Sequence, residues 1–282
     1  MHRVRHGSVE EGLLRQGVLI VPSIDLALLR SQAIALTGLL DDPALFRASL
    51  RLLMEAHAHR MLRHGPSMNR RGALQAWDVP GLLIREVEAA LRLAAQSRPD
   101  RALAAADAVW MEGKLEEKLL AVYLAGFSRG SADLRALLLR WLDGTEDPTV
   151  LQELSIHVCL PLAAENPTLF RSQLRAWMES PVPSARRFGW MSLSAWQEEK
   201  SSDSIFASFD LLPMIFSETD PEAVQSAAGI LARLAQSVPQ ETRGWLEDLS
   251  PDILRRGRPF FRAALPSLSP ELSAVIHPPR PE

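Results

Sequence analysis

The sequence predicts an all-α protein in which antiparallel helix pairs stack into an α-α superhelix. Three observations support this fold class. Alanine and leucine, both good helix formers, dominate a chain of 282 residues that is 47% hydrophobic. No stretch shows the sustained two-residue alternation that is typical of a half-buried strand. A capping residue followed by proline recurs along the chain, and this combination is typical of a helix start.

The recurring cap-and-proline pairs divide the chain into helices in order. In each pair the first side chain can accept a hydrogen bond from the helix N-terminus, and the proline takes the first helical position, where no amide hydrogen is needed. The pairs are Asp42-Pro43, Asp147-Pro148, Asn166-Pro167, Asp220-Pro221, Ser250-Pro251 and Ser269-Pro270.

The segments that follow these starts are amphipathic. After Asn166-Pro167, for example, Phe170, Leu174 and Trp177 recur at helical spacing. Helices of about 12 to 18 residues with short loops between them match antiparallel pairs. Many such helices without a long heptad seam favour an open, HEAT-like helical-repeat solenoid over a closed bundle.

Changes in composition suggest three parts. Residues 1–76 are predicted to form an N-terminal arm and a helical extension, with a helical pair over 24–65 and a linker over 64–72. Residues 77–266 are predicted to form the helical-repeat domain, and residues 267–282 a C-terminal tail that ends without order.

Composition also limits the cellular location and the binding partners that we expect. No apolar run reaches the length of a membrane span, and we expect neither a signal peptide nor a transmembrane helix but a cytoplasmic location. The single cysteine, Cys159, excludes an internal disulfide. The net charge of −3 excludes a strongly basic, non-specific nucleic-acid binder, so any DNA contact must use a local basic face.

The residues that could carry chemistry are few. His57 and His59 are only two positions apart and point in different directions on a helix, so we expect no metal site. We expect no cofactor, because the chain has no phosphate-binding glycine loop. Cys159 is interpreted as a core residue. The acidic residues Glu112, Glu116 and Glu117 begin a helix, where negative charge suits the helix dipole.

Three further features remain open to two interpretations. Glu153 lies beside an apolar stripe, so it is either paired with a neighbouring arginine or functional. Most of the seven tryptophans are expected in the core, and one or two could line a groove. The pair Arg186-Arg187 opens an apolar helix that contains Trp190, and it is either exposed solubilising charge or an anion contact.

Three blocks in the same order carry a resemblance to a known family. They are residues 109–121 (with Val-Trp followed by an acidic, Ala/Leu-rich helix), residues 166–187 and residues 220–229. From Trp77 to about Leu265 the chain resembles the HEAT-like-repeat DNA alkylation-repair glycosylases of bacteria. The resemblance implies a concave helical groove that binds duplex DNA and releases alkylated purines.

The resemblance also assigns a candidate catalytic position. The family's Trp-Asp-x-x-Asp segment, whose last aspartate is catalytic, compares with residues 147–153. That aspartate falls on Gln152 or Glu153, depending on where a gap is placed, so Glu153 is the candidate acid. The tryptophan of this segment is absent at Thr149 or its neighbour.

The remaining family positions support two different functions. Arg187 falls on the family's DNA-contacting arginine, so Arg186, Arg187 and Trp190 are the candidate DNA-binding residues. A second family tryptophan is replaced by Ile230. We therefore expect base excision to be weak or absent. The alternative is a non-catalytic helical-repeat module that binds another protein, which the net charge and the missing aromatic residues favour.

Overall fold

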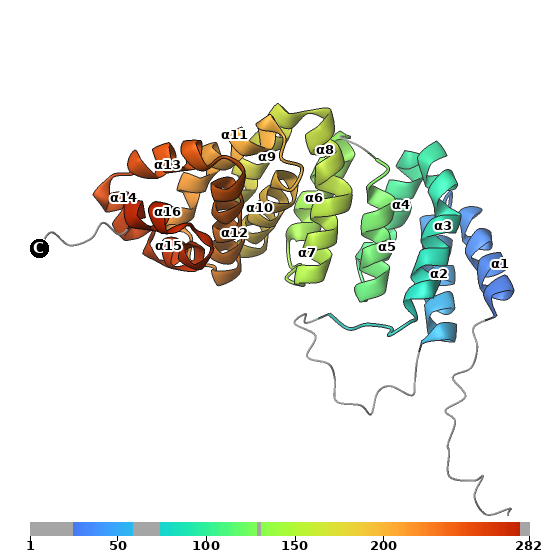
Figure 1. The fold of residues 1–282 in the computed structure, drawn as a ribbon. Helices are drawn as coiled ribbons and strands as arrows, with labels where there is room; N and C mark the ends of the chain where they lie inside the picture. Colours follow the sequence, from blue (N-terminus) through green and yellow to red (C-terminus); the bar gives the residue numbers. More distant parts are fainter. Residues whose placement is uncertain (1–24, 59–73, 129–130, 277–282) are drawn as a thin grey trace, which may run out of the picture.

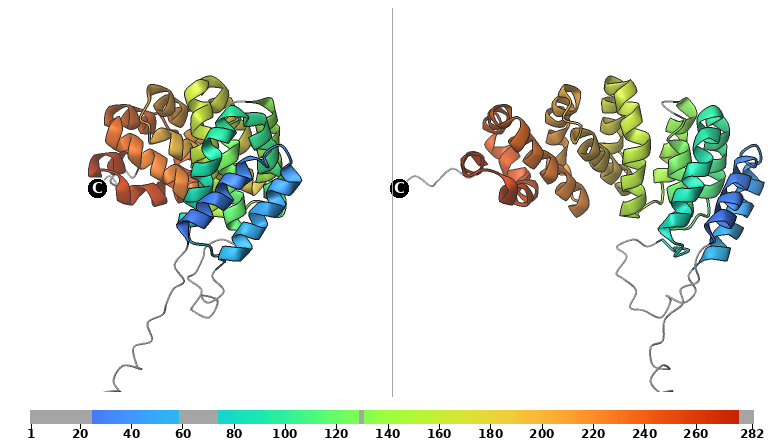
Figure 2. Two further views of the ribbon diagram at one scale, coloured as in Figure 1. Left: turned by 90° about the vertical axis from the view of Figure 1, so that its right-hand side faces the viewer. Right: turned by 45° about the vertical axis from the view of Figure 1, so that its right-hand side comes forward.

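The computed structural model describes residues 25–58, 74–128 and 131–276. Of these residues 80% are helical, and no strand occurs among them. The predicted all-α, helical-repeat superhelix is therefore confirmed. Figure 1 shows the helices following one another in a row, from α1 at one end to α14, α15 and α16 at the other. Figure 2 includes a view from the α1 end of the row.

The α-helices of the described segments have the following bounds: α1 Leu26–Thr37, α2 Pro43–His57, α3 Gly81–Ser97, α4 Pro99–Trp110, α5 Leu115–Ala125, α6 Ala132–Leu142, α7 Pro148–Leu154, α8 Leu160–Glu165, α9 Pro167–Met178, α10 Pro183–Gln197, α11 Ser202–Leu211, α12 Pro221–Ser237, α13 Pro239–Glu247, α14 Pro251–Arg256, α15 Arg258–Ala264 and α16 Pro270–Ile276. A π-helical turn, η2 (Ser155–Cys159), joins α7 to α8, and two 3-10 turns are η3 (Leu212–Ser217) and η4 (Leu265–Ser267).

All six predicted cap-and-proline pairs begin helices, namely α2, α7, α9, α12, α14 and α16. The capping side chain accepts a backbone N–H in each case; Asp42, for instance, accepts from Leu45 at 3.0 Å and Asn166 accepts from Leu169 at 3.0 Å. Local sequence chemistry therefore sets where these helices start.

The helices pack in two rows. In the first row α1, α3, α5, α7, α10, α12 and α15 each contact the next, and the second row includes the contacts of α2 with α4, α4 with α6, and α9 with α11. The predicted N-terminal helical pair is present as α1 and α2, and it stacks on α3 and α4. The predicted arm, linker and terminal tail residues at 1–24, 64–72 and 277–282 lie outside the described residues. The domain boundaries after residues 76 and 266 stay a prediction.

Aromatic side chains fill the space between the rows. Trp110 and Trp141 stack with their ring centroids 4.1 Å apart, and Phe170 meets Trp196 edge-on at 5.1 Å. The expectation that most tryptophans pack the core is confirmed, because five of the seven are buried: Trp110, Trp141, Trp177, Trp190 and Trp196.

Neighbouring helix pairs are also joined by side-chain bonds of a regular sequence separation. Arg140 bonds Asp107, Arg175 bonds Asp210, and other bonds of this kind likewise link residues 32 to 36 positions apart. This separation is the length of one structural repeat. Within the described ranges, no helix is long and apolar enough to cross a membrane.

Two glutamates at the start of α5 hold the chain segment that enters α3. The Glu116 carboxylate accepts the backbone N–H groups of Trp77 and Asp78 at 2.8 and 2.9 Å. Glu117, which is fully buried, accepts the Trp77 indole N–H and the backbone N–H of Lys114, both at 2.9 Å. These glutamates therefore fasten one segment to another, a role that goes beyond the helix-dipole role expected from the sequence.

We expect Glu117→Ala to lower the free energy of unfolding by about 2–4 kcal/mol, because it removes a buried acceptor and leaves two part-buried N–H donors without a partner. Urea unfolding followed by tryptophan fluorescence measures this loss. Glu112→Ala is the matched control: Glu112 pairs with Arg47 but its side chain is 70% exposed, so its loss should cost less than about 1 kcal/mol. Equal losses in the two variants would contradict the anchoring role.

Candidate functional site

Glu153 and His157 occupy one side of the helix that runs through α7, η2 and α8. The His157 Nε2 atom lies 3.1 Å from a Glu153 carboxylate oxygen, and their side chains are 44% and 36% exposed. The partner of Glu153 is thus a histidine on its own helix and not a neighbouring arginine. His157 belongs to the π-helical turn, and such turns inside α-helices are frequent at functional sites.

The helices before α7 in the first row add two residues to this pair. The Tyr123 ring of α5 meets the His157 ring edge-on, with centroids 6.3 Å apart. The Tyr123 hydroxyl donates a hydrogen bond of 3.0 Å to the backbone carbonyl of Glu88 on α3. We call Glu88, Tyr123, Glu153 and His157 the Glu153 cluster.

A glycine permits the close approach that forms this cluster. Gly126 ends α5, and a Cβ atom built there would lie 2.7 Å from the His157 carbonyl oxygen. A separation that short is a steric clash, so any larger residue would push the π-helical turn away from α5. Gly126 therefore sets how near His157 lies to Tyr123.

The environment of Glu88 disfavours the charged form of its carboxyl group. Partial burial raises the pKa of Glu88 and is the largest effect. The charges of His157 and Arg85 act to lower this pKa, and the charge of Glu153 acts to raise it. The Glu88 carboxyl consequently holds its proton more readily than an ordinary glutamate. A carboxyl group with a raised pKa near a second, part-exposed carboxyl group is an arrangement that can divide acid and base roles between the two.

The structure separates the two positions that the sequence left open for the catalytic acid. Glu153 faces the α5 side of α7 through its His157 partner. Gln152 instead lines a small cavity of about 190 Å³ on the α10 side, together with Met191 of α10 and Ser226 of α12. The cavity between α7, α10 and α12 therefore receives a neutral amide from α7, and the carboxyl group that lines it is that of Glu198, directly after α10.

The positions of the missing family tryptophans differ in exposure. Thr149 is exposed in the first turn of α7, whereas Ile230 is fully buried within α12. Neither presents an aromatic face. The ring that lies beside Glu153 is that of His157, and the Tyr123 ring in turn meets His157.

Arg186 and Arg187, in the first turn of α10, hold the turn that precedes α12. Arg186 Nε donates to Glu218 at 2.9 Å. Arg187 donates to Asp220 at 2.8 and 3.0 Å, and its guanidinium also lies 3.2 Å from Glu222. Both arginines are therefore engaged within the chain, and no hydrogen bond or ion pair of the described residues links them to Glu153.

These ion pairs shift the pKa of both carboxyl groups downward. Burial acts to raise the pKa of Asp220, but hydrogen bonds from Arg187 and from the backbone N–H of Glu222 outweigh it. Glu218 has a lowered pKa for similar reasons, with Arg186 among the donors. An Arg187→Ala substitution would thus cost stability as well as a candidate DNA contact.

Two other residues singled out in the sequence lie in the core. Trp190 is only 1% exposed, because the apolar stripe of α10 directs its ring inward, so in this conformation it presents no surface to DNA. Cys159 is fully buried beside Ser192, and burial raises the pKa of its thiol to about 12. The interpretation of Cys159 as a core residue is confirmed.

Sequence reasoning missed Glu88 and Tyr123. Both lie in helices that looked unremarkable by composition, and Glu88, Tyr123 and His157 are 35 and 34 positions apart. That spacing equals the repeat length seen in the side-chain bonds between helix pairs. A search for polar residues recurring at this interval would have grouped them. Among the residues that the structure describes, no cluster of His, Cys, Asp or Glu could hold a metal ion.

The fold and the cluster define an all-helical repeat protein with carboxylate, imidazole and phenol groups gathered on one row of helices. The family model described as DNA alkylation repair enzyme matches residues 54–256. The chain belongs to this DNA alkylation repair enzyme family. Searches of the curated proteins and of the solved structures find no match.

We expect Glu88→Gln to be more stable than the unmodified protein at pH 7. The raised pKa of Glu88 means that its charged form is disfavoured in the folded state, so stability is lost as the pH rises through the unfolded value of 4.5 and then the folded value. Glutamine does not ionise, so its advantage should disappear below about pH 4. Thermal unfolding across this pH range measures the difference.

Glu86→Gln, on the same helix, should behave in the opposite way. The hydrogen bond from Arg30 lowers the pKa of Glu86, so this charge stabilises the fold above its unfolded pKa and its removal should be unfavourable at pH 7. If Glu88→Gln also lost stability at pH 7, the assigned environment of Glu88 would be wrong.

Proposed function

We propose that this protein is a DNA alkylation-repair protein that binds duplex DNA along the first row of helices, with base excision weak or absent. The family membership supports a repair role. The observation that carries the proposed site is the part-exposed Glu153 carboxylate paired with His157, whose ring meets that of Tyr123. Any excision would depend on this carboxylate.

The chemistry of alkylated bases explains why a lone carboxylate could suffice for slow excision. Alkylation makes the base cationic and hence a good leaving group, so the sugar develops positive charge as the bond breaks. An ionised Glu153 beside that sugar would stabilise the charge. A protonated Glu88 is not required for this step, because the departing base needs no proton.

Three features support weak or absent excision. Thr149 and Ile230 stand where the family has tryptophans, and the cavity between α7, α10 and α12 is lined from α7 by Gln152. A single lost electrostatic contact in a transition state costs on the order of 100- to 1000-fold in rate. The cavity volume of about 190 Å³ is also below the several hundred Å³ typical of ligand pockets.

DNA binding itself is proposed to be modest and strongly dependent on salt. The net charge of −3 opposes association, so phosphate contacts must come from local arginines. Arg85 is exposed on α3 near the Glu153 cluster. Arg187 could contact DNA only by leaving Asp220, which would lower the gain from that contact.

A base-release assay on methylated duplex DNA tests the proposal, with released purines separated by chromatography. We expect little or no release from the unmodified protein and none from Glu153→Gln, which removes the charge but keeps the shape. Glu165→Gln, an exposed acid at the end of the same helical run, is the matched control and should leave any release unchanged. Robust release by the unmodified protein would overturn the expected inactivity. Robust release by Glu153→Gln would overturn the assigned acid.

A second candidate function, binding of another protein, has one observation in its favour. Ile34 of α1 and Leu45 and Leu52 of α2 are 61%, 49% and 66% exposed at the end of the row. Exposed apolar side chains are common at protein interfaces. Failure of the unmodified protein to bind duplex DNA at any salt concentration would favour this function over repair.

A further inference from the structure

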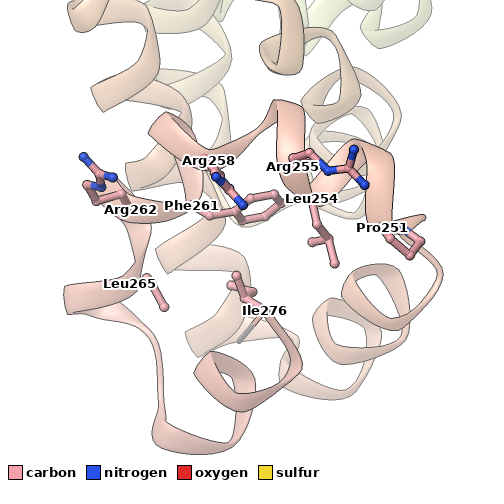
Figure 3. A pocket seen from close by; sticks show the side chains of 8 residues that line it. All are labelled: Pro251, Leu254, Arg255, Arg258, Phe261, Arg262, Leu265 and Ile276. Atoms are coloured by element: carbon pink, nitrogen blue, oxygen red, sulfur yellow. The ribbon is translucent and has the colours of Figure 1, made fainter. Parts of the chain in front are cut away.

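A basic cavity lies at the C-terminal end of the row, away from the Glu153 cluster. It has a volume of about 590 Å³, and Figure 3 shows Arg255, Arg258 and Arg262 along one side of it. Phe261 and Ile276 are among the apolar side chains that complete its wall. Among the described residues, no aspartate or glutamate lines this cavity.

Two of the three arginines of this cavity have no acidic partner among the described residues. Arg258 and Arg262 are four positions apart on α15 and therefore lie on one side of the helix. Neither makes a hydrogen bond or ion pair with any residue that the structure describes. Arg255 lies 3.2 Å from Asp252, but both side chains are more than 60% exposed, so this pair neutralises little charge.

Several other arginines of the chain are paired with carboxylates. Arg140, Arg175 and Arg187, for example, each bond a carboxylate of the adjacent helix pair. Three exposed guanidinium groups line one cavity that no carboxylate of the described residues lines, so the cavity presents positive charge. In a chain of net charge −3, such a cluster is not explained by overall charge.

The lining favours one class of anion. Guanidinium groups match the oxygen atoms of a phosphate, which they can bind in pairs of hydrogen bonds. The half-buried apolar side chains of Leu254 and Leu265 in its wall suit a planar, weakly polar group next to that phosphate. A volume of about 590 Å³ lies within the range of small-ligand sites.

We propose that this cavity binds a nucleotide phosphate together with its sugar or base. Five of the residues named here, Arg258, Phe261, Arg262, Leu265 and Ile276, lie beyond residue 256, where the family match ends. The cavity is therefore additional to the site proposed for repair. The nucleotide could be free in solution, or it could belong to a DNA strand, because α15 packs against α12 in the first row.

The double variant Arg258→Ala/Arg262→Ala tests this proposal in the full chain. Isothermal titration with adenosine 5′-monophosphate examines the free nucleotide, and fluorescence anisotropy with a 20-base-pair duplex over a series of salt concentrations examines DNA. Arg140→Ala/Arg175→Ala is the matched control: it removes the same charge from two exposed, carboxylate-paired arginines outside the first row.

The two arms distinguish the two sources of the phosphate. For a free nucleotide, we expect the unmodified protein and the control to bind adenosine 5′-monophosphate and the double variant to bind it at least about tenfold more weakly. For a DNA strand, we expect the double variant alone to reduce the slope of log affinity against log salt by about 2, one unit for each lost phosphate contact.

The proposal is overturned if the double variant and the control behave alike in both arms. If the unmodified protein binds duplex DNA but the double variant and the control behave alike in both arms, the proposed repair function stands and the proposed role of the cavity fails. If the unmodified protein binds the nucleotide but no duplex, the cavity stands and the proposed DNA binding fails. The two proposals therefore fail independently.

Discussion

The packing of each first-row helix against the next is the constraint on which the rest of the structure depends. A single amphipathic helix pair cannot bury its apolar face alone, so each pair is ordered by its neighbours. This packing is close where α5 meets the π-helical turn, because Gly126 leaves no room for a Cβ atom beside the His157 carbonyl. The contact between Tyr123 and His157, and through it the Glu153 cluster, follows from this approach.

A second layer of organisation comes from ion pairs between successive repeats. Arg186 and Arg187 bracket the turn before α12 by binding Glu218 and Asp220, and Arg175 binds Asp210 in the neighbouring pair. Arginines used in this way hold the repeats in register but offer less free charge to DNA. The arginines of the C-terminal cavity are different, since Arg258 and Arg262 have no such partner among the described residues.

Much of the fold could be predicted from local sequence chemistry. Cap-and-proline pairs such as Asp147-Pro148 specify helix starts independently of tertiary structure, and the burial of Cys159 follows from its place in an apolar segment. The candidate site was only half predicted. Glu153 could be singled out from its position, but its partners Glu88 and Tyr123 come from other repeats.

The failures share one physical cause. The sequence shows which residues lie on one helix, whereas the site depends on which side of the helix faces which neighbour. The Trp190 ring lies in the core and not in a groove. Gln152 and Glu153 are adjacent in the sequence, but their side chains face different neighbouring helices. Likewise, Glu117 looked like a dipole partner but binds the Trp77 indole of a distant segment.

The central claim is that DNA lies on the first row of helices at the Glu153 cluster. Hydrogen–deuterium exchange of the full chain, with and without a duplex containing a methylated purine, tests this claim most directly. We expect the duplex to slow exchange in α3, in α5 and in the run from α7 to α8, and to leave α9 and α11 of the second row unchanged. Protection confined to α9 and α11, or no protection under conditions where the duplex is bound, would contradict the account.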